Sequence, residues 1–281
     1  MLRRQTSGSV VCPSCGKLTG VQDEACWNCG RRNPGMWGYG PLLRRLGQDL
    51  GFVPLVMWGC ALLYGATLIA DTGNLGGMLS PSPLSLYAFG ASGTLPVVEG
   101  GRWWTLLSAS WLHGGLLHIF FNVLWIRQLG PAVASIYGAG RMIIIYVVAG
   151  VVGFAASSFG PLVAPPLALI LGRGSFTVGA SAAIFGLLGA LVLYGRKGST
   201  EVGRQAWLWA AILFAFGFIM PAVDNWAHLG GFLGGFGMAA LLDPLKRERV
   251  DHLLMAMLLL AASLAAVLFS LVTGLAELRS L

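Results

Sequence analysis

The segment VGASAAIFGLLGALVLYG, residues 178–195, carries no charged side chain and holds one serine, Ser181, close to its start. A helix needs ~17–25 mostly apolar residues to cross a bilayer, so this segment is long enough to span a membrane. Helical structure is expected because backbone polar groups in lipid must find hydrogen-bond partners within the segment. The hydroxyl of Ser181 is then a polar group inside a membrane, where such groups are candidates for function.

The same lack of charge recurs along the chain. Of the 281 residues, 56% are hydrophobic and 10% are charged, whereas about a quarter of the residues are charged in soluble domains. The sequence therefore predicts an all-α polytopic membrane protein with about seven spans. The first span follows a polar, cysteine-bearing region, so a cleaved signal peptide is not expected. The other charge-free segments are 51–70, 107–126, 142–158, 205–223, 225–242 and 253–276.

Basic residues gather in alternate connections between the predicted spans. The connections on the other side hold only Arg102 and Arg173, and Arg279 lies in the tail. By the positive-inside rule, the N-terminus is cytoplasmic and the C-terminus is outside. Membrane orientation accounts for the net charge of +7, so no nucleic-acid partner is expected. The residues that set this orientation are Arg31, Arg32, Arg44, Arg45, Arg127, Arg141, Arg196, Lys197, Arg204, Lys246, Arg247 and Arg249.

Two C-x₂-C pairs lie in the N-terminal region, CPSC and CWNC. Four thiolates in two such pairs suit tetrahedral Zn²⁺ with a closed coordination shell, which is typical of a structural site. Two disulfides are the alternative, and the reducing cytoplasm disfavours them. Residues 1–34 are therefore predicted to form a zinc-ribbon-like module, followed by a linker at 35–50. The expected zinc ligands are Cys12, Cys15, Cys26 and Cys29.

This module is expected to serve recruitment or regulation through a cytoplasmic partner. Its basic neighbours can also contact anionic membrane lipid headgroups. An orientation signal explains the same arginines equally well.

Polar side chains lie near the outer ends of three predicted spans. The second span reads WLHGGLLHIFFNVLWI and carries His113, His118 and Asn122, and the sixth carries His228 close to its start. His118 and Asn122 are four residues apart and so share one face of a helix. Because these two spans and the Ser181 span all enter the membrane from outside, Ser181, His228, His118 and Asn122 are predicted to lie at similar depths.

This set of side chains suits acyl transfer. A serine hydroxyl becomes an effective nucleophile when an adjacent base takes its proton, and His228 is a candidate base for Ser181. The developing oxyanion needs hydrogen-bond donors, for which His118 and Asn122 are candidates. Small residues would let the fourth and sixth spans approach closely. The glycines in question are Gly179, Gly186, Gly189, Gly230, Gly231, Gly234 and Gly235.

Other readings of the same residues remain open at this point. A lone serine in an apolar helix usually bonds back to the carbonyl four residues earlier. Paired histidines can bind metal, but the chain has no H-E-x-x-H and no carboxylate near them. A proton path through His118 and His228 in a transporter is a further alternative. Asp224 is expected to cap the sixth span, although it could instead orient His228 as a third acid.

These motifs resemble those of the rhomboid intramembrane serine proteases. That family has H-x₄-H-x₃-N in its second helix, G-x-S in its fourth and A-H-x-x-G in its sixth, with an Arg-Trp element in the long loop after the first. The resemblance covers roughly residues 50–245. The matching residues are His113, His118, Asn122, Gly179, Ser181, Ala227, His228, Gly231, Arg102 and Trp103.

The resemblance implies a catalytic dyad of Ser181 and His228 without a third acid. It also implies that His118 and Asn122 stabilise the oxyanion and that Gly179 places the backbone around the serine. No cofactor for catalysis is implied. The implied substrate is a transmembrane helix of another protein, cut near helix-weakening and small residues. A catalytically silent relative that binds membrane proteins is the alternative.

Two residues depart from the family pattern. Ala182 stands where the family often has glycine, and it keeps the site small. Phe185 stands where a tyrosine often packs on the catalytic histidine, and it retains the aromatic face. By this resemblance, residues 51–245 form a six-helix core and 246–281 a seventh transmembrane helix. The resemblance also suggests a prokaryotic plasma membrane.

Overall fold

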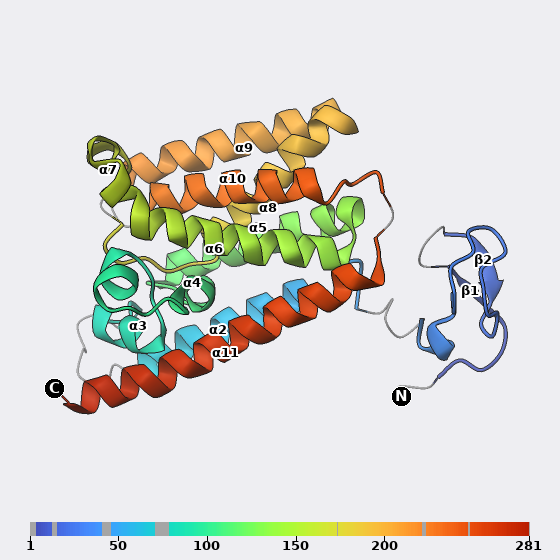
Figure 1. Ribbon diagram of the computed structural model, residues 1–281, viewed down its shortest axis with the longest axis horizontal. Coiled ribbons are helices and arrows are strands. Elements are labelled where there is room, and N and C mark those ends of the chain that lie inside the picture. Colours follow the sequence, from blue (N-terminus) through green and yellow to red (C-terminus); the bar gives the residue numbers. More distant parts are fainter. Residues whose placement is uncertain are drawn as a thin grey trace.

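The computed structural model describes residues 4–12, 16–40, 46–70, 79–172, 174–220, 223–246 and 248–280. Apolar helices form one bundle, and a small two-stranded module precedes it in the chain (Figure 1). The predicted all-α polytopic fold is confirmed.

The elements follow one another with short connections between most helices. The strands are β1 (Ser9–Val11) and β2 (Leu18–Gly20), and the short helical turns are η1 (Met36–Gly38), the π-helix η3 (Thr94–Glu99) and η4 (Ala109–Trp111). The α-helices are α2 (Phe52–Ala70), α3 (Pro83–Phe89), α4 (Thr105–Ser108), α5 (Leu116–Tyr137), α6 (Ala139–Val163), α7 (Pro165–Leu171), α8 (Ser181–Lys197), α9 (Thr200–Ile219), α10 (Asn225–Leu241) and α11 (Val250–Ser280).

Seven of the described helices correspond to the seven predicted spans. By length and composition, α2, α5, α6, α9 and α11 are each able to cross a membrane. Helices α8 and α10 have 17 residues each, which is the lower end of the ~17–25 residues that a span needs. These two shorter helices are also the ones that carry Ser181 and His228 near their first residues.

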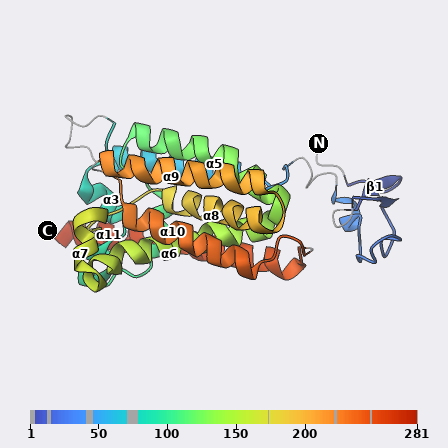
Figure 2. The same ribbon diagram turned by 90° about the horizontal axis from the view of Figure 1, so that it is seen from above.

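Helix α8 is the centre of the bundle. Figure 2 shows it between a pair formed by α5 and α9 and a pair formed by α6 and α10. Eleven of its residues, from Ala182 to Leu193, are buried. An apolar helix that is buried on most sides belongs to the core of a bundle.

The backbones of α8 and α10 touch because glycine stands at the crossing. A Cβ atom at Gly231 would lie 2.1 Å from the carbonyl oxygen of Ala182, and one at Gly235 would lie 2.1 Å from that of Gly186. The predicted close crossing of these spans is therefore confirmed. Gly230 and Gly234 are different, since their positions face Ala156 and Val152 of α6 instead of α8.

We expect Gly231→Ala to destabilise the protein by about 1–3 kcal/mol, because the added methyl group overpacks a backbone contact. Gly237→Ala is the matched control on the same helix, since a Cβ there meets nothing within 4 Å. Thermal unfolding of both variants in one detergent measures the difference. Equal unfolding temperatures for the two variants would contradict the assignment of Gly231 to the crossing.

The second predicted span is wrong at both ends. Residues 105–111 form α4 and η4, and α5 begins only at Leu116, so His113 precedes the helix. The reason is the pair Gly114–Gly115, since Gly115 adopts an extended N-cap conformation with φ 173°. At the other end α5 continues past Arg127, whose side chain is exposed, to a reversal at Gly138 with φ +90°.

The three prolines of segment 159–177, Pro161, Pro165 and Pro166, predict irregular backbone, yet residues 159–163 and 165–171 are helical. Helix α6 continues through Pro161 to Val163, and α7 then starts at Pro165. Proline suits the first position of a helix because its missing N–H has no partner there anyway. By the resemblance, residues 72–105 correspond to the family's long loop after the first helix, and their described part likewise contains α3 and η3.

Candidate functional site

Ser181 is the first residue of α8 and is half-buried. The chain reaches it through Gly179, whose φ of +125° is rarely adopted by residues with a side chain. The N–H of Gly179 donates to the carbonyl of Ala109 at 3.0 Å, which fixes the backbone just before the serine. At a helix start the first N–H groups have no partner within the helix, and the helix dipole favours negative charge there.

His228 lies in the first turn of α10 and is buried. Its Nε2 is 3.0 Å from the Oγ of Ser181, which is hydrogen-bonding distance. The ring of Phe185 stacks on the imidazole with a centroid distance of 4.1 Å and an interplanar angle of 18°. This stacking holds the imidazole plane toward the serine.

A role of His228 as a base for Ser181 requires one particular tautomer of its ring. If Nε2 accepts from the serine hydroxyl, Nδ1 carries the ring proton. Nδ1 has no hydrogen-bond partner among the described residues. Asp224, the candidate third acid, instead accepts from the N–H of Ala227 at 3.1 Å and from the hydroxyl of Ser157. The predicted helix cap is therefore confirmed for Asp224.

His118 lies directly beside the serine segment. A Cβ atom added to Gly179 would lie 2.6 Å from His118 Nε2 and 3.7 Å from Ser181 Oγ. The N–H of Gly114 donates to Nδ1 of His118 at 3.4 Å, so the ring proton belongs on Nε2. The Nε2–H donor of His118 thus lies beside Gly179, two residues before Ser181.

Asn122 lies one turn further along α5 and is buried. Its side-chain amide donates to the carbonyl of His118 at 2.8 Å, and its Oδ1 has no partner among the described residues. The amide has a second N–H that this bond does not use. His113 packs its ring edge-on against His118, with a centroid distance of 5.0 Å and an angle of 65°. His113 therefore supports the ring of His118 from the connection before α5.

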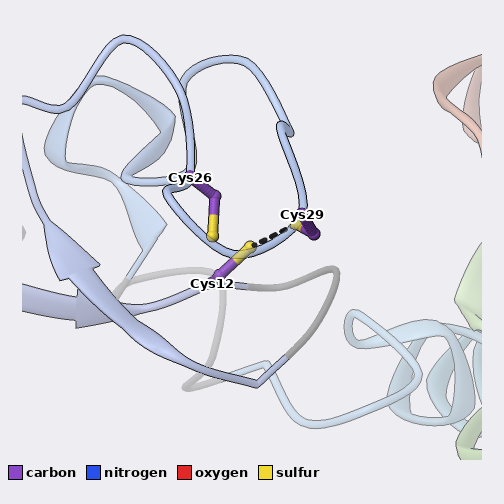
Figure 3. Close-up of side chains that lie close together, drawn as sticks. All are labelled: Cys12, Cys26 and Cys29. Atoms are coloured by element: carbon purple, nitrogen blue, oxygen red, sulfur yellow. Dashed lines mark hydrogen bonds between the residues drawn. The ribbon is translucent and has the colours of Figure 1, made fainter.

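A second candidate site lies in the N-terminal module. The sulfur atoms of Cys12, Cys26 and Cys29 lie within 4.8 Å of one another, and Figure 3 shows their side chains converging. Cys15, the fourth expected ligand, is outside the described residues. Three converging thiols form a group that can hold a metal ion.

The geometry of this cluster fits zinc. A tetrahedral site with Zn–S bonds of ~2.3 Å places its sulfurs ~3.8 Å apart, and Cys12 and Cys29 have their sulfurs 3.7 Å apart. The two cysteine pairs also share one backbone pattern. Gly16 N–H donates to Cys12 carbonyl at 2.9 Å, and Gly30 N–H donates to Cys26 carbonyl at 2.8 Å. Both glycines have positive φ, so each pair ends in the same turn.

The first cysteine pair follows strand β1, and strand β2 leads from it toward the second pair. The two strands form an antiparallel hairpin, with Val10 opposite Thr19. The Thr19 hydroxyl and the Gly20 N–H donate to the carboxylate of Asp23 at 2.6 and 2.7 Å. These two bonds hold the pKa of Asp23 below its ordinary value. They tie the end of the hairpin to the turn that leads to the second pair.

The comparison with protein families decides the identity of the bundle. Residues 100–245 match the family model described as Rhomboid domain, and this match takes in more than half of the chain. The chain belongs to the rhomboid family. With its apolar helices, this rhomboid is a multi-pass membrane protein.

Named relatives of this rhomboid come from bacteria and plants. It is 37% identical over 193 residues to rhomboid protease GluP of Bacillus subtilis (strain 168), across 66% of the chain and 35% of that relative. It is 36% and 34% identical over 177 residues to RHOMBOID-like proteins 4 and 1 of Arabidopsis thaliana, each across 59% of the chain. The chain spans 41% and 42% of those two relatives.

Sequence reasoning missed a buried arginine at the opposite end of the bundle from Ser181. Arg141 was assigned to membrane orientation, yet its guanidinium is buried and donates to the carbonyls of Asp243 and Lys246 at 2.9 and 2.7 Å. Its Nε donates to His252 Nδ1 at 3.2 Å. Arg141 therefore ties the start of α6 to the connection between α10 and α11. Nothing in its position between two charge-free segments distinguishes it from an exposed arginine.

Proposed function

We propose that this rhomboid is an intramembrane serine endopeptidase that cleaves transmembrane segments of other proteins. The observation that carries the proposal is the 3.0 Å contact between Ser181 Oγ and His228 Nε2. A nucleophile within hydrogen-bond reach of a base, with the base oriented by a third group, is the arrangement that activates a serine. Here the third group is the stacked ring of Phe185.

In this mechanism, Nε2 of His228 takes the hydroxyl proton as Ser181 Oγ attacks the carbonyl carbon of the scissile bond. The imidazolium then gives that proton to the leaving amine, and an acyl-enzyme remains on the serine. A water molecule, deprotonated by His228, then attacks the acyl carbon. The bond between that carbon and Ser181 Oγ breaks, the carboxylic acid leaves, and His228 returns the proton to Ser181 Oγ. No carboxylate is assigned to His228, because Asp224 is engaged in capping α10.

Charge on the carbonyl oxygen develops beside the start of α8. The candidate donors are the Nε2–H of His118, the second amide N–H of Asn122 and the backbone N–H of Ser181. Donors fixed in place before the reaction stabilise an oxyanion without reorganisation. The dipole of α8 adds to this effect, since Ser181 is at the helix N-terminus.

The substrate class follows from the reaction and the location. A peptide carbonyl in an intact helix is hydrogen-bonded and shielded, so the segment to be cut must be extended at the serine. Small and helix-weakening residues make that extension less costly. We therefore expect cleavage at such positions in a transmembrane protein near the outer half of the bilayer. The charge distribution supports a cytoplasmic N-terminus and an outer C-terminus, and a prokaryotic plasma membrane is the proposed location.

The proposed division of the chain follows these roles. Residues 1–34 form the metal-binding module, 35–50 the linker, 51–245 the protease core and 246–281 the seventh transmembrane helix. Within 35–50, residues Met36–Gly38 form the turn η1.

The function is tested by reconstituting the full chain in lipid vesicles with a model single-span substrate. We expect two product fragments, with the cut site placed by mass spectrometry within the transmembrane segment, and no cleavage by Ser181→Ala. Intact substrate after binding to the wild-type protein would favour a catalytically silent membrane-protein binding factor. Proton flux without cleavage would favour a transporter.

The module is proposed to hold one structural Zn²⁺ through Cys12, Cys15, Cys26 and Cys29. We expect about one equivalent of zinc in the purified full chain by elemental analysis, and a loss of zinc in Cys26→Ser. Cys60→Ser is the matched control, because Cys60 is buried in α2, outside the module. Absence of bound metal under reducing conditions would contradict the proposal.

Zinc removal is expected to leave the chemical step intact. The module lies at the end of the bundle opposite to the starts of α8 and α10 (Figure 1). Cleavage of the model substrate by Cys26→Ser at the wild-type rate is therefore the expected result. A folded Cys26→Ser protein that cannot cleave would show that the module acts on the site.

A further inference from the structure

Helix α11 carries two buried serines that face the short helices leading to the proposed active site. Ser263 and Ser270 are seven residues apart, so they share a face, since seven residues make about two turns. Their exposed fractions are 2% and 0%. A buried hydroxyl is unfavourable unless it is hydrogen-bonded, so the partners of these serines indicate what this face of α11 does.

We use the name shelf for residues 105–111, which form α4 and η4, together with Trp104. Each of the two serines receives a hydrogen bond from a tryptophan of this shelf. Trp111 Nε1 donates to Ser263 Oγ at 2.6 Å, and Trp104 Nε1 donates to Ser270 Oγ at 3.0 Å. Ser263 Oγ in turn donates to the carbonyl of Leu107 at 3.1 Å. The two serines therefore hold the shelf at both of its ends.

The contact around Ser270 extends to a buried arginine. Ser270 Oγ lies 3.3 Å from the hydroxyl of Ser108, which donates to the carbonyl of Gly90 at 2.9 Å. Arg102 Nη2 donates to the carbonyl of Ser270 at 3.4 Å and Nη1 to that of Tyr87 at 2.6 Å. Among the described residues no carboxylate pairs with Arg102. Its charge is instead met by carbonyl oxygens and by the Tyr87 ring, whose centroid is 4.2 Å away.

The opposite side of the shelf touches the backbone that leads to Ser181. The carbonyl of Ala109, in the middle of the shelf, accepts from the N–H of Gly179 at 3.0 Å. His113 follows the shelf by two residues and packs against His118. The position of the shelf is therefore transmitted both to the nucleophile and to the donor that faces it.

We propose that α11 is a positioning element for the active site, and that Ser263 and Ser270 are positioning residues. They fix the shelf through the two tryptophans, and the shelf fixes Gly179 and the ring of His113. This inference rests on the proposed serine-protease function. It assigns to the seventh helix a role in the reaction beyond crossing the membrane.

The test measures how fast Ser181 reacts with a fluorophosphonate in the full chain. The rate constant at saturating probe is independent of the folded fraction, because unfolded molecules do not react. We expect the double variant Ser263→Ala/Ser270→Ala to react about tenfold more slowly, as two indole N–H groups lose their acceptors. Ser263→Thr keeps the hydroxyl beside a small cavity and is expected to restore the rate lost in Ser263→Ala.

Thr273→Ala is the matched control on α11. Among the described residues, its hydroxyl bonds to carbonyls of its own helix alone, those of Phe269 and Ser270, and so its removal should leave the rate unchanged. A wild-type rate in the double serine variant would overturn the inference. So would a lower unfolding temperature with a normal rate constant, or a Ser263→Thr variant as slow as Ser263→Ala. Failure of the proposed function itself is distinguishable, because then the wild-type protein would not react at Ser181.

Discussion

Alanine at Ser181 or at His228 is expected to lower the rate of proteolysis by at least ~10⁴-fold, and the double variant is expected to be no slower than either single variant. The two side chains act as one unit, and the loss of either partner removes nucleophilic attack altogether. His228 Nε2 is the base that the structure places within hydrogen-bonding distance of Ser181 Oγ, at 3.0 Å. Initial rates of substrate cleavage in vesicles, for both single variants and the double variant, measure the effect.

Ser135→Ala serves as the control for a serine-to-alanine change. Ser135 lies on α5, and its hydroxyl donates to the carbonyl of Ala132 three residues earlier. This is the ordinary use of serine in an apolar helix. If Ser181→Ala retained substantial cleavage, Ser181 would belong to the same ordinary class and the serine-protease mechanism would be wrong.

The second large effect is expected at the oxyanion donors. His118→Ala and Asn122→Ala should each lower kcat by about 10²-fold or more, as the loss of one oxyanion donor does in serine proteases. KM should change little, because a donor used mainly in the transition state contributes little to substrate binding. Both kcat and KM are obtained from cleavage rates over a range of substrate densities in the membrane.

The alternative for Asn122 is a purely structural role, and measurements on the same Asn122→Ala variant distinguish the two. Its amide bond to the carbonyl of His118 lies within α5, so the side chain could serve to order that turn alone. In that case Asn122→Ala would lower the unfolding temperature while the folded molecules turned over normally. Measuring thermal stability and kcat on one preparation separates the two roles, and normal kcat would remove Asn122 from the proposed oxyanion site.

The sequence was informative where physical constraints are local. Lack of charge over 178–195 and 225–242 predicted the two central helices to within a few residues, because lipid leaves few other conformations open. Gly231 and Gly235 were among the small residues from which the close crossing was predicted. In the structure, a Cβ atom at either position would meet backbone atoms of α8. The positions of Ser181 and His228 at helix starts followed from span boundaries alone.

The sequence was less informative where structure depends on distant packing. Residues 107–111 carry no charge and were predicted to begin the second span, yet they belong to the shelf, for which α11 supplies hydrogen-bond acceptors more than 150 residues away. The start of α5 depends on the conformation of Gly115, which hydropathy does not register. Ser263 and Ser270 share a helical face, which their spacing could have revealed. Their tryptophan partners could not have been found from the spacing alone.

The central claim is that Ser181 is a nucleophile activated by His228. It is tested most directly by treating the full-length protein in detergent with a fluorophosphonate and locating the adduct by mass spectrometry. We predict one covalent adduct on Ser181, no adduct in Ser181→Ala and a strongly reduced adduct in His228→Ala. An unmodified Ser181 in folded wild-type protein, or equal labelling of wild type and Ser181→Ala, would contradict the account.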